Sequence, residues 1–253
     1  MQGDDGRDSF RFLDEYCRGK LKEWLAVESA KVHYISSFLI PLTATHSIRL
    51  FTLNYDESVE TALSHQRHAV NEKWTAGFDE HGWSPDLLDS TRFEIYLYKL
   101  HGSLDWVDDE KLGKCSVRWP PAVESEEIPQ GADSLLILGA DAKLQAVDPF
   151  LTLLYRFKTV IGSCQLLIIV GYSFGDRHIN AMIIEALQRD PTMHCIVVNK
   201  CMTSGEALPS EFKRMVDIEK RFHFIGRQAK VAFESGEIVQ VINSTVQTVE
   251  EPF

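Results

Sequence analysis

Short, continuous apolar runs constrain the fold of this chain more than any other feature of its sequence. Val, Ile, Leu and aromatic residues fill five such runs, and a helical stretch from about 178 to 188 precedes the last one. Strands that are apolar throughout are typical of a parallel sheet covered by helices on both faces. The sequence therefore predicts a doubly wound α/β fold with strands at 48–53, 95–100, 135–138, 166–170 and 195–198.

The remaining segments are assigned around this sheet. Two amphipathic stretches, 9–26 and 31–39, are expected to form helices that cover a sheet face, the second ending before Pro41. The mixed stretch 74–92 and the acidic, proline-containing stretch 108–133 are expected to be excursions from the sheet. In the tail, 230–233 and 238–242 flank Gly236 and predict a hairpin.

We therefore expect a single domain over residues 1–253. Its parts are a helical N-terminal segment (1–47), a ligand-binding core (48–200) and a C-terminal extension (201–253).

Charge and cysteine content exclude several classes of function. The chain has 26 Lys and Arg against 37 Asp and Glu, a net charge of −11, which disfavours direct binding of nucleic acid or an anionic membrane. It has no apolar stretch long enough to span a bilayer, and its first ten residues do not resemble a signal peptide, so we expect a cytoplasmic protein. Its five cysteines are widely spaced without a C-x-x-C pair, and neither structural zinc nor a disulfide framework is expected.

Three polar motifs follow predicted strands, at the positions where open α/β sheets bind ligands. The first is Thr52-Leu53-Asn54-Tyr55-Asp56, with Glu60 one turn later. For Asp56 alone, an Asx turn that caps the next helix is the favoured interpretation. Asn54 is a stronger candidate for a functional side chain.

The second motif is His101-Gly102, after the strand at 95–100. Glycine lets the backbone turn away and leaves the imidazole facing the crevice, although a histidine at a strand end is more often structural.

The third motif runs from Gly171 to Asn180 and reads G-Y-S-F-G-D-R-H-I-N. A turn from a buried strand into a helix suits anionic oxygens, to which Ser173 can add a hydroxyl, so phosphate binding is one interpretation. The alternative is a plain strand-to-helix turn with Asp176 as N-cap. The letters also fit the G-x-S-x-G elbow of serine hydrolases, with His194 and His223 available as later partners. No G-x-G-x-x-G and no P-loop motif occurs.

Taken together, the motifs resemble those of the sirtuin superfamily, and more closely its bacterial sirtuin-like branch in anti-phage defence. Sirtuins carry T-Q-N-I-D, His-Gly, G-T-S and a later Asn at a strand end. The defence branch favours T-x-N-Y-D with a following acid, L-H-G-S-x-x-W and G-Y-S-F-x-D-x-H-I-N. The matching residues are Thr52 to Asp56 with Glu60, Leu100 to Trp106, Gly171 to Asn180, and Val198-Asn199.

This resemblance implies a Rossmann-like sirtuin fold that binds NAD and cleaves its nicotinamide glycosidic bond, with NAD as substrate. Asn54 would position the nicotinamide ribose or the attacking water, and His101 would act as general base. Five further residues would bind the nucleotide, with Asp56 on the carboxamide, Ser173 on phosphate or ribose and Asn199 on the adenosine ribose; the others are Thr52 and Gly171.

The chain departs from the family in two ways. It lacks the zinc-binding cysteine pairs of the deacylase sirtuins, which weakens a deacylase interpretation. It also lacks, in residues 1–47, the first strand and the G-A-G-x-S-like phosphate loop. The chain is then a fragment or short form, or another chain supplies the loop, or NAD binding is impaired.

Two classes of function therefore remain beside the serine hydrolase. One is an NAD-hydrolysing effector controlled by homo-oligomerisation or by a partner such as a HerA-type ATPase. The other is a nucleotide-sensing or scaffold subunit without turnover.

Overall fold

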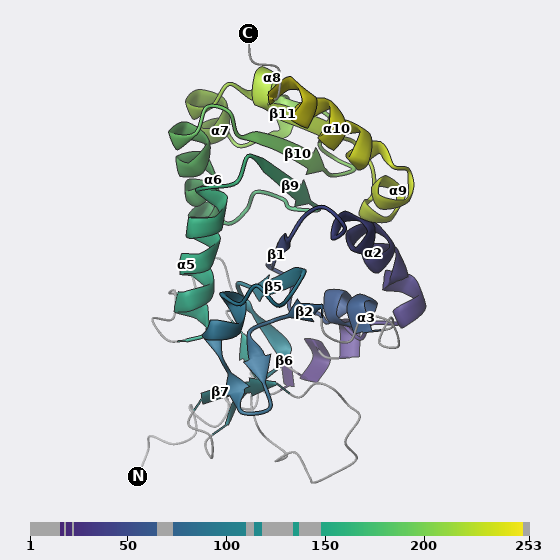
Figure 1. Ribbon diagram of the computed structural model, residues 1–253, viewed down its shortest axis with the longest axis vertical. Coiled ribbons are helices and arrows are strands. Elements are labelled where there is room, and N and C mark those ends of the chain that lie inside the picture. Colours follow the sequence, from purple (N-terminus) through teal and green to yellow (C-terminus); the bar gives the residue numbers. More distant parts are fainter. Residues whose placement is uncertain are drawn as a thin grey trace. The chain divides into compact units, whose positions relative to one another are not determined.

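The computed structural model describes residues 16, 17, 19–21, 23–64, 73–109, 114–117, 134–136 and 148–249. The chain forms two compact units, Met1–Leu154 and Tyr155–Phe253. The boundary falls inside helix α5 (Phe150–Ile161) (Figure 1). Each unit contains its own parallel sheet, so the α/β class expected from the apolar runs is confirmed.

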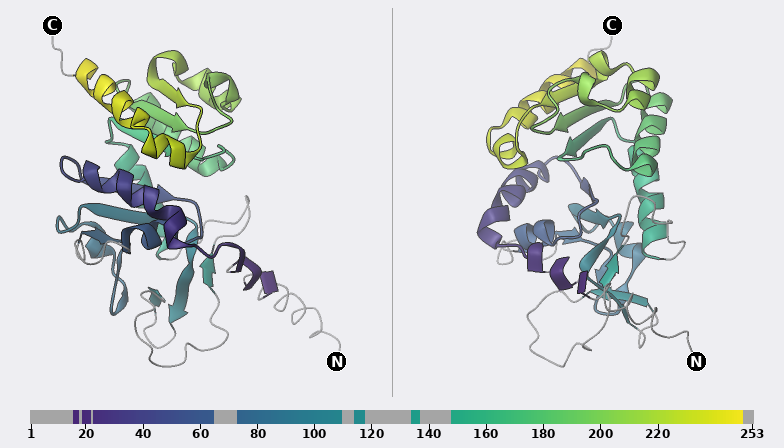
Figure 2. Two further views of the ribbon diagram at one scale, coloured as in Figure 1. Left: turned by 90° about the vertical axis from the view of Figure 1, so that its right-hand side faces the viewer. Right: turned by 180° about the vertical axis from the view of Figure 1, so that it is seen from behind.

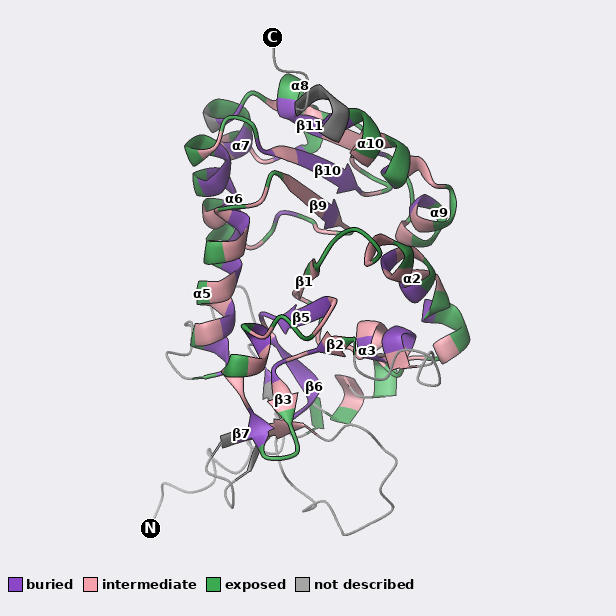
Figure 3. Ribbon diagram, in the orientation of Figure 1, coloured by how far each residue is buried: buried purple, intermediate pink, exposed green. Residues whose placement is uncertain are grey.

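The first unit is built around the parallel sheet β1-β5-β2. Its strands are β1 (Ile48–Thr52), β5 (Ile95–Lys99) and β2 (Trp74–Thr75), and β1 pairs with β5 from Ile48↔Ile95 to Thr52↔Lys99. All five residues of the central strand β5 are buried, as expected for an apolar strand with neighbours on both sides (Figure 3). Leu39 of α2 (Ser29–Leu42), Leu63 of α3 (Ser58–Ser64) and Ile95 share one core cluster.

Antiparallel strands complete the first unit. The pair β3 (Phe78–Asp79) and β4 (Gly82–Trp83) precedes the 3₁₀ helix η1 (Pro85–Leu88). Strand β6 (Gly102–Asp109) lies between β7 (Lys114–Val117) and β8 (Ser134–Leu136). The expected excursion at 74–92 thus contains short strands. Most of the excursion at 108–133, and residues 137–138 of the strand expected at 135–138, lie outside the described residues.

The second unit is a three-stranded parallel sheet with helices on both sides. Strands β9 (Leu166–Val170), β10 (His194–Val198) and β11 (Phe222–Ile225) lie in the order β11-β10-β9. Figures 1 and 2 show α6 (Arg177–Arg189) on one side of this sheet and α10 (Glu237–Val249) on the other. The shorter helices are η2 (Gly205–Ala207), α7 (Ser210–Met215), α8 (Ile218–Arg221) and α9 (Ala229–Glu234).

Two predictions for helices and turns need correction. The tail hairpin is wrong, because 230–233 and 238–242 lie in α9 and α10, which follow each other across Gly236 at φ +73°. Ile238 and Thr245 are buried seven residues apart, a helical spacing that the hairpin prediction overlooked. Helix α2 also continues through Pro41 into its last turn. Half of the helix expected at 9–26 lies outside the described residues; those described between 16 and 24 are helical, and 25 and 26 are not.

In the described part of the chain, no helix has both the length and the apolarity needed to cross a membrane.

Candidate functional site

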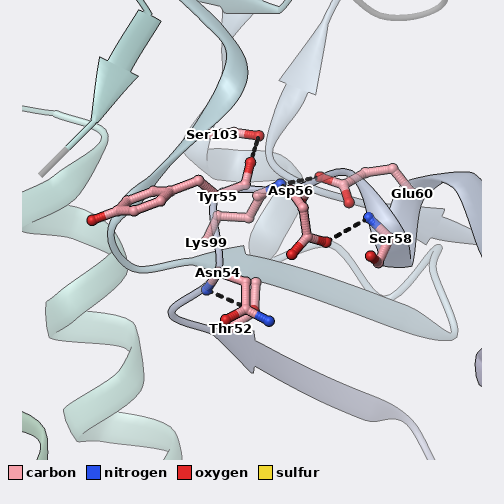
Figure 4. A network of polar contacts seen from close by, with 8 residues as sticks. All are labelled: Thr52, Asn54, Tyr55, Asp56, Ser58, Glu60, Lys99 and Ser103. Atoms are coloured by element: carbon pink, nitrogen blue, oxygen red, sulfur yellow. Dashed lines mark hydrogen bonds and ion pairs between the residues drawn. The ribbon is translucent and has the colours of Figure 1, made fainter. Parts of the chain in front are cut away.

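The loop at residues 53–57, here called the Asn54 loop, connects the carboxyl end of β1 to α3. Neighbouring backbone carbonyls are held by the segment that follows β5. Leu100 N donates to Thr52 O at 3.0 Å, and Leu104 N donates to Tyr55 O at 3.1 Å. Ser103 Oγ lies 3.4 Å from the same Tyr55 oxygen (Figure 4). These contacts attach the Asn54 loop to the start of β6.

A buried lysine makes a further connection to this loop. Lys99, the last residue of β5, is 1% exposed. Its Nζ donates to the Asp56 carbonyl at 2.6 Å and to Glu60 Oε1 at 2.7 Å, so Figure 4 shows it joined to both the loop and α3. Because an unpaired charge is costly in the interior, Lys99 and Glu60 depend on each other.

The Glu60 carboxyl is in an unfavourable environment for a charge. Burial raises its pKa to about 7, and the Asp105 carboxylate adds to this shift, against the opposing effect of the Lys99 ammonium. Among the described residues, Glu60 Oε2 and Asp105 Oδ1 are both buried without a hydrogen-bond partner. The buried cluster of Lys99, Glu60 and Asp105 therefore contains two carboxyl groups and one ammonium.

The Asp56 and Asn54 side chains of this loop have different surroundings. Asp56 Oδ1 accepts a hydrogen bond from Ser58 N at 2.9 Å, which is the helix-capping Asx turn that the sequence favours for this residue. Asn54 is exposed, and its backbone N–H donates to Thr52 Oγ1 at 3.1 Å. Thr52 thus shapes the backbone of the loop, while the Asn54 amide faces outward.

His101 lies in the turn between β5 and β6, beside the same loop. Gly102 has φ +86°, so the reversal predicted after the histidine is present and requires glycine. The His101 and Tyr55 rings lie 6.4 Å apart, centre to centre. The structure therefore brings Asn54, Asp56 and His101 to one edge of the β1-β5-β2 sheet.

In the second unit, residues 171–176, here called the Ser173 loop, follow β9. Two positions have left-handed backbone, Gly171 at φ +67° and Phe174 at φ +56°. Ser173 is exposed at the turn, whereas the Phe174 ring is buried against Phe212 at 5.2 Å. The strained turn therefore directs the phenyl ring inward and the serine outward.

The N-terminus of α6 already holds an anion from the chain itself. Asp176 Oδ1 accepts from the backbone N–H groups of His178 at 2.8 Å and Ile179 at 3.1 Å. This is the N-cap alternative considered for the motif. Phosphate cannot use these two amides while Asp176 caps the helix, so any phosphate contact here falls to Ser173 and the loop backbone.

A buried asparagine organises the Ser173 loop from within. Asn180 is 2% exposed, its Nδ2 donates to Phe174 O at 2.9 Å, and its Oδ1 accepts from the Tyr172 hydroxyl at 2.9 Å. Its Nδ2 also lies 3.3 Å from Glu211 Oε1 of α7. The Tyr172 hydroxyl also lies 3.0 Å from the Asp176 carbonyl, so its one proton is shared between two acceptors. Burial raises the pKa of this phenol above its ordinary value. The Ser173 loop is thus held by a network of hydrogen bonds centred on Asn180.

Asn199 connects the Ser173 loop to the end of β10. Its Nδ2 donates to Tyr172 O at 3.2 Å, and its Oδ1 accepts from Cys201 N at 2.9 Å. The side chain thus has a structural role, in addition to the nucleotide contact that the resemblance implies.

The arrangement of the second unit argues against a serine hydrolase. Ser173 follows the carboxyl end of β9, whereas His194 pairs with Leu166 at the other end of that strand. The two ends of β9, at Leu166 and Val170, are four residue steps apart, which corresponds to roughly 13 Å. His223 lies on the edge strand β11, two strands away from β9, and pairs with Ile196; its Nε2 lies 3.5 Å from Thr245 Oγ1. Neither histidine can reach Ser173 as a general base.

The sequence motifs did not predict the structural roles of Lys99, Glu60, Asp105 and Asn180. Lys99 precedes Leu100-His101 within an apolar strand, and a lysine at such a position signals a buried, paired charge. Asn180 ends the third motif but stands on the first turn of a helix, where its contacts cannot be read from spacing.

The cysteines and metal-binding residue types give no further site. All five cysteines are free thiols, with Cys115 and Cys195 buried. Within the described ranges, no three His, Cys, Asp or Glu side chains are grouped to hold a metal ion.

Comparison with known proteins gives concordant results. A chain from a structural study of the mechanism and regulation of Sir2 enzymes matches with a TM-score of 0.51 at 16% identity, covering 94% of this chain and 81% of that chain. At this identity the match demonstrates the fold alone, and the fold is Rossmann-like and sirtuin-like. No curated protein matches. The family model described as SIR2-like domain matches residues 48–215, which include every motif discussed above. Because this match covers more than half of the chain, the protein belongs to the SIR2-like family.

Proposed function

We propose that this protein binds NAD and hydrolyses its nicotinamide glycosidic bond. The observation that carries the proposal is the attachment of the Asn54 loop to the His101 turn through Thr52 O, Tyr55 O and Asp56 O. A glycosidic cleavage with an oxocarbenium-like transition state needs orientation and polar stabilisation of this kind.

In the proposed reaction the bond between C1′ of the ribose and the nicotinamide nitrogen breaks, and nicotinamide leaves with the bonding electrons. Water adds to C1′ and loses a proton, which gives ADP-ribose. Asn54 orients the ribose or the water through its exposed amide. His101 accepts the proton from the water or from a ribose hydroxyl, which is a suitable task for an imidazole.

The remaining residues are proposed to bind the nucleotide. Asp56 contacts the carboxamide with the carboxylate oxygen that does not cap Ser58, and Thr52 shapes the loop. Ser173 binds phosphate or ribose through its exposed hydroxyl, and Gly171 permits the turn. Asn199 approaches the adenosine ribose and holds Tyr172 at the same time.

Calorimetry with NAD and ADP-ribose, together with a nicotinamide-release assay, tests this function. We expect binding and release by the wild type, and loss of release in Asn54→Ala with the fold retained. The same loss is expected in His101→Ala, for which His81→Ala is the matched control, because His81 is exposed in the same unit. Unchanged release in Asn54→Ala would remove the role assigned to that residue.

A nucleotide-sensing or scaffold subunit is the second candidate. Two groups that could bind a nucleotide already make hydrogen bonds within the chain, which favours this candidate. The backbone amides at the start of α6 bind Asp176, and the Asn199 side chain binds Tyr172 O and Cys201 N. Binding of ADP-ribose without nicotinamide release would support it. No response to either nucleotide would remove both candidates.

We also propose that the activity serves bacterial anti-phage defence in the cytoplasm, under the control of homo-oligomerisation or of a partner such as a HerA-type ATPase. A net charge of −11 disfavours direct sensing of foreign DNA, and unregulated NAD hydrolysis would harm the cell. Light scattering, alone and with the product of the neighbouring gene, tests this. A monomer with full turnover, unaffected by the neighbour, would contradict it.

A further inference from the structure

Three buried ionisable residues of the first unit have no part in the proposed chemistry. Lys99, Glu60 and Asp105 come from β5, α3 and β6, and each is less than 10% exposed. The pair Lys99–Glu60 is almost fully removed from water, with side-chain exposures of 0% and 5%. Such a pair needs a reason, since its desolvation offsets much of its attraction.

The contacts of Lys99 supply this reason. Of the two acceptors of its ammonium, one is the carboxylate of Glu60 and the other is the backbone carbonyl of Asp56. An apolar pair could fill the same space, and such replacements are often neutral for stability. It could not donate a hydrogen bond to the Asp56 carbonyl.

This hydrogen bond acts on the part of the Asn54 loop that follows Asn54. On the other side, Thr52 O is held by Leu100 N, in line with the β1–β5 ladder. Tyr55 O and Asp56 O are held by Leu104 N and Lys99 Nζ, outside the parallel ladder. Asn54 therefore lies between the Thr52 carbonyl, which is held next to the strand pairing, and the Tyr55 and Asp56 carbonyls, which are held outside it.

We propose that Lys99 is a positioning residue for NAD hydrolysis. Its ammonium, held in place by Glu60, fixes the Asp56 carbonyl and with it the orientation of the Asn54 amide. The effect of Lys99 on the rate of hydrolysis rests on the proposed function. Its effect on the Asn54 loop does not, because the loop can be studied without turnover.

Hydrogen exchange with residue resolution measures the position of the loop. The double variant Lys99→Met/Glu60→Gln removes both charges of the pair together, so Glu60 is not left as a buried carboxylate without its ammonium. We expect the Leu104 amide, which donates to Tyr55 O, to exchange at least about tenfold faster than in the wild type, because the neighbouring anchor is lost. Amides of β10 in the second unit should be unchanged.

The matched control is Lys73→Met/Glu94→Gln. It makes the same chemical change in a pair of the same unit at 2.8 Å, with side chains that are 49% and 34% exposed. Exchange at Leu104 should stay at the wild-type rate. Equal exchange in the buried-pair variant and the control would overturn the positioning role, whether or not the protein hydrolyses NAD.

Kinetics then separate positioning from binding. In the buried-pair variant, kcat for nicotinamide release should fall about 10-fold to 100-fold with KM within about threefold, because orientation of a bound substrate is lost. A wild-type kcat would overturn the proposal. An inactive wild type would instead overturn the proposed function, and the exchange measurement would still decide the role of Lys99.

A second variant is available if the first fails to fold. Lys99→Gln/Glu60→Gln keeps a polar pair in which the residue 99 side chain is one bond too short for both contacts, and it is expected to give the same exchange result.

Discussion

The Asn54 loop and the Ser173 loop occupy equivalent places, each following the carboxyl end of a parallel strand, but they are held in different ways. The Asn54 loop depends on residues that lie far away in the sequence, such as Lys99, which is 43 positions from Asp56. The Ser173 loop depends mainly on its own helix, through Asp176 and Asn180. One anchor is a buried ion pair, and the other is a local network of hydrogen bonds around a strained backbone.

This difference has energetic and functional consequences. A buried charge is sensitive to its partner and to pH, whereas a local capping network changes little between pH 5 and 8. The loop that is expected to perform chemistry is therefore the one with the charged anchor. Four variants test this contrast, in order of decreasing effect.

The largest effect is expected for Lys99→Met alone. It leaves Glu60 buried without its ammonium, and breaking such a pair costs about 3–5 kcal/mol. Urea unfolding followed by tryptophan fluorescence measures this in the first unit, because all five tryptophans precede residue 155. The exposed counterpart Lys73→Met should cost less than about 1 kcal/mol. A similar loss of unfolding free energy in both variants would show that burial does not make the Lys99–Glu60 pair more important for stability than an exposed pair.

The second effect is a pH dependence. Because the pKa of Glu60 in the folded protein is raised to about 7 from 4.5, the folded state binds the proton more tightly than the unfolded state. The resulting stabilisation is full below about pH 4.5 and is lost as pH rises through about 7, by up to about 3 kcal/mol. The wild type should therefore lose more stability than Glu60→Gln between pH 4.5 and 8. Parallel pH profiles of unfolding free energy would contradict the shift.

In the Ser173 loop, Asn180→Ala is expected to cost about 2 kcal/mol, because it leaves the buried Phe174 carbonyl without its donor. Far-UV circular dichroism during urea unfolding is a suitable readout, since the second unit contains no tryptophan. Gln188→Ala changes an exposed residue of the same helix and should alter stability by less than about 0.5 kcal/mol. Equal effects of the two substitutions would remove Asn180 from the network.

The smallest effect is expected at the cap of α6. Asp176→Ala should destabilise by about 1 kcal/mol, and Asp176→Asn by much less, because asparagine also caps helices well. The loss should be the same at pH 6 and pH 8. If Asp176→Ala were neutral, the contacts to His178 N and Ile179 N would not stabilise the helix.

Strands β1, β5, β9 and β10 were predictable because each is a largely apolar run, as in 166–170, which matches β9 residue for residue. The strand expected at 135–138 overlaps β8, which pairs antiparallel with β6, and the parallel strands β2 and β11 were not predicted. The strand ends, and therefore Asn54, His101 and Ser173, followed from the same pattern. Lys99 was not predictable as an anchor, since its partners Glu60 and Asp56 come close only after β1 and β5 pair. The hairpin predicted for the tail was wrong because the Val and Ile residues at 238–242 favour a strand by propensity but are also spaced as on a helix face. Packing decides between the two.

Nicotinamide release from NAD by wild type and His101→Ala tests the central claim most directly. We expect release by the wild type and a rate about 10²–10⁴-fold lower in His101→Ala, the range for loss of a general base. Release should stay at the wild-type rate in His81→Ala. Equal rates in His101→Ala and wild type, or binding of NAD by the wild type without any release, would contradict the account.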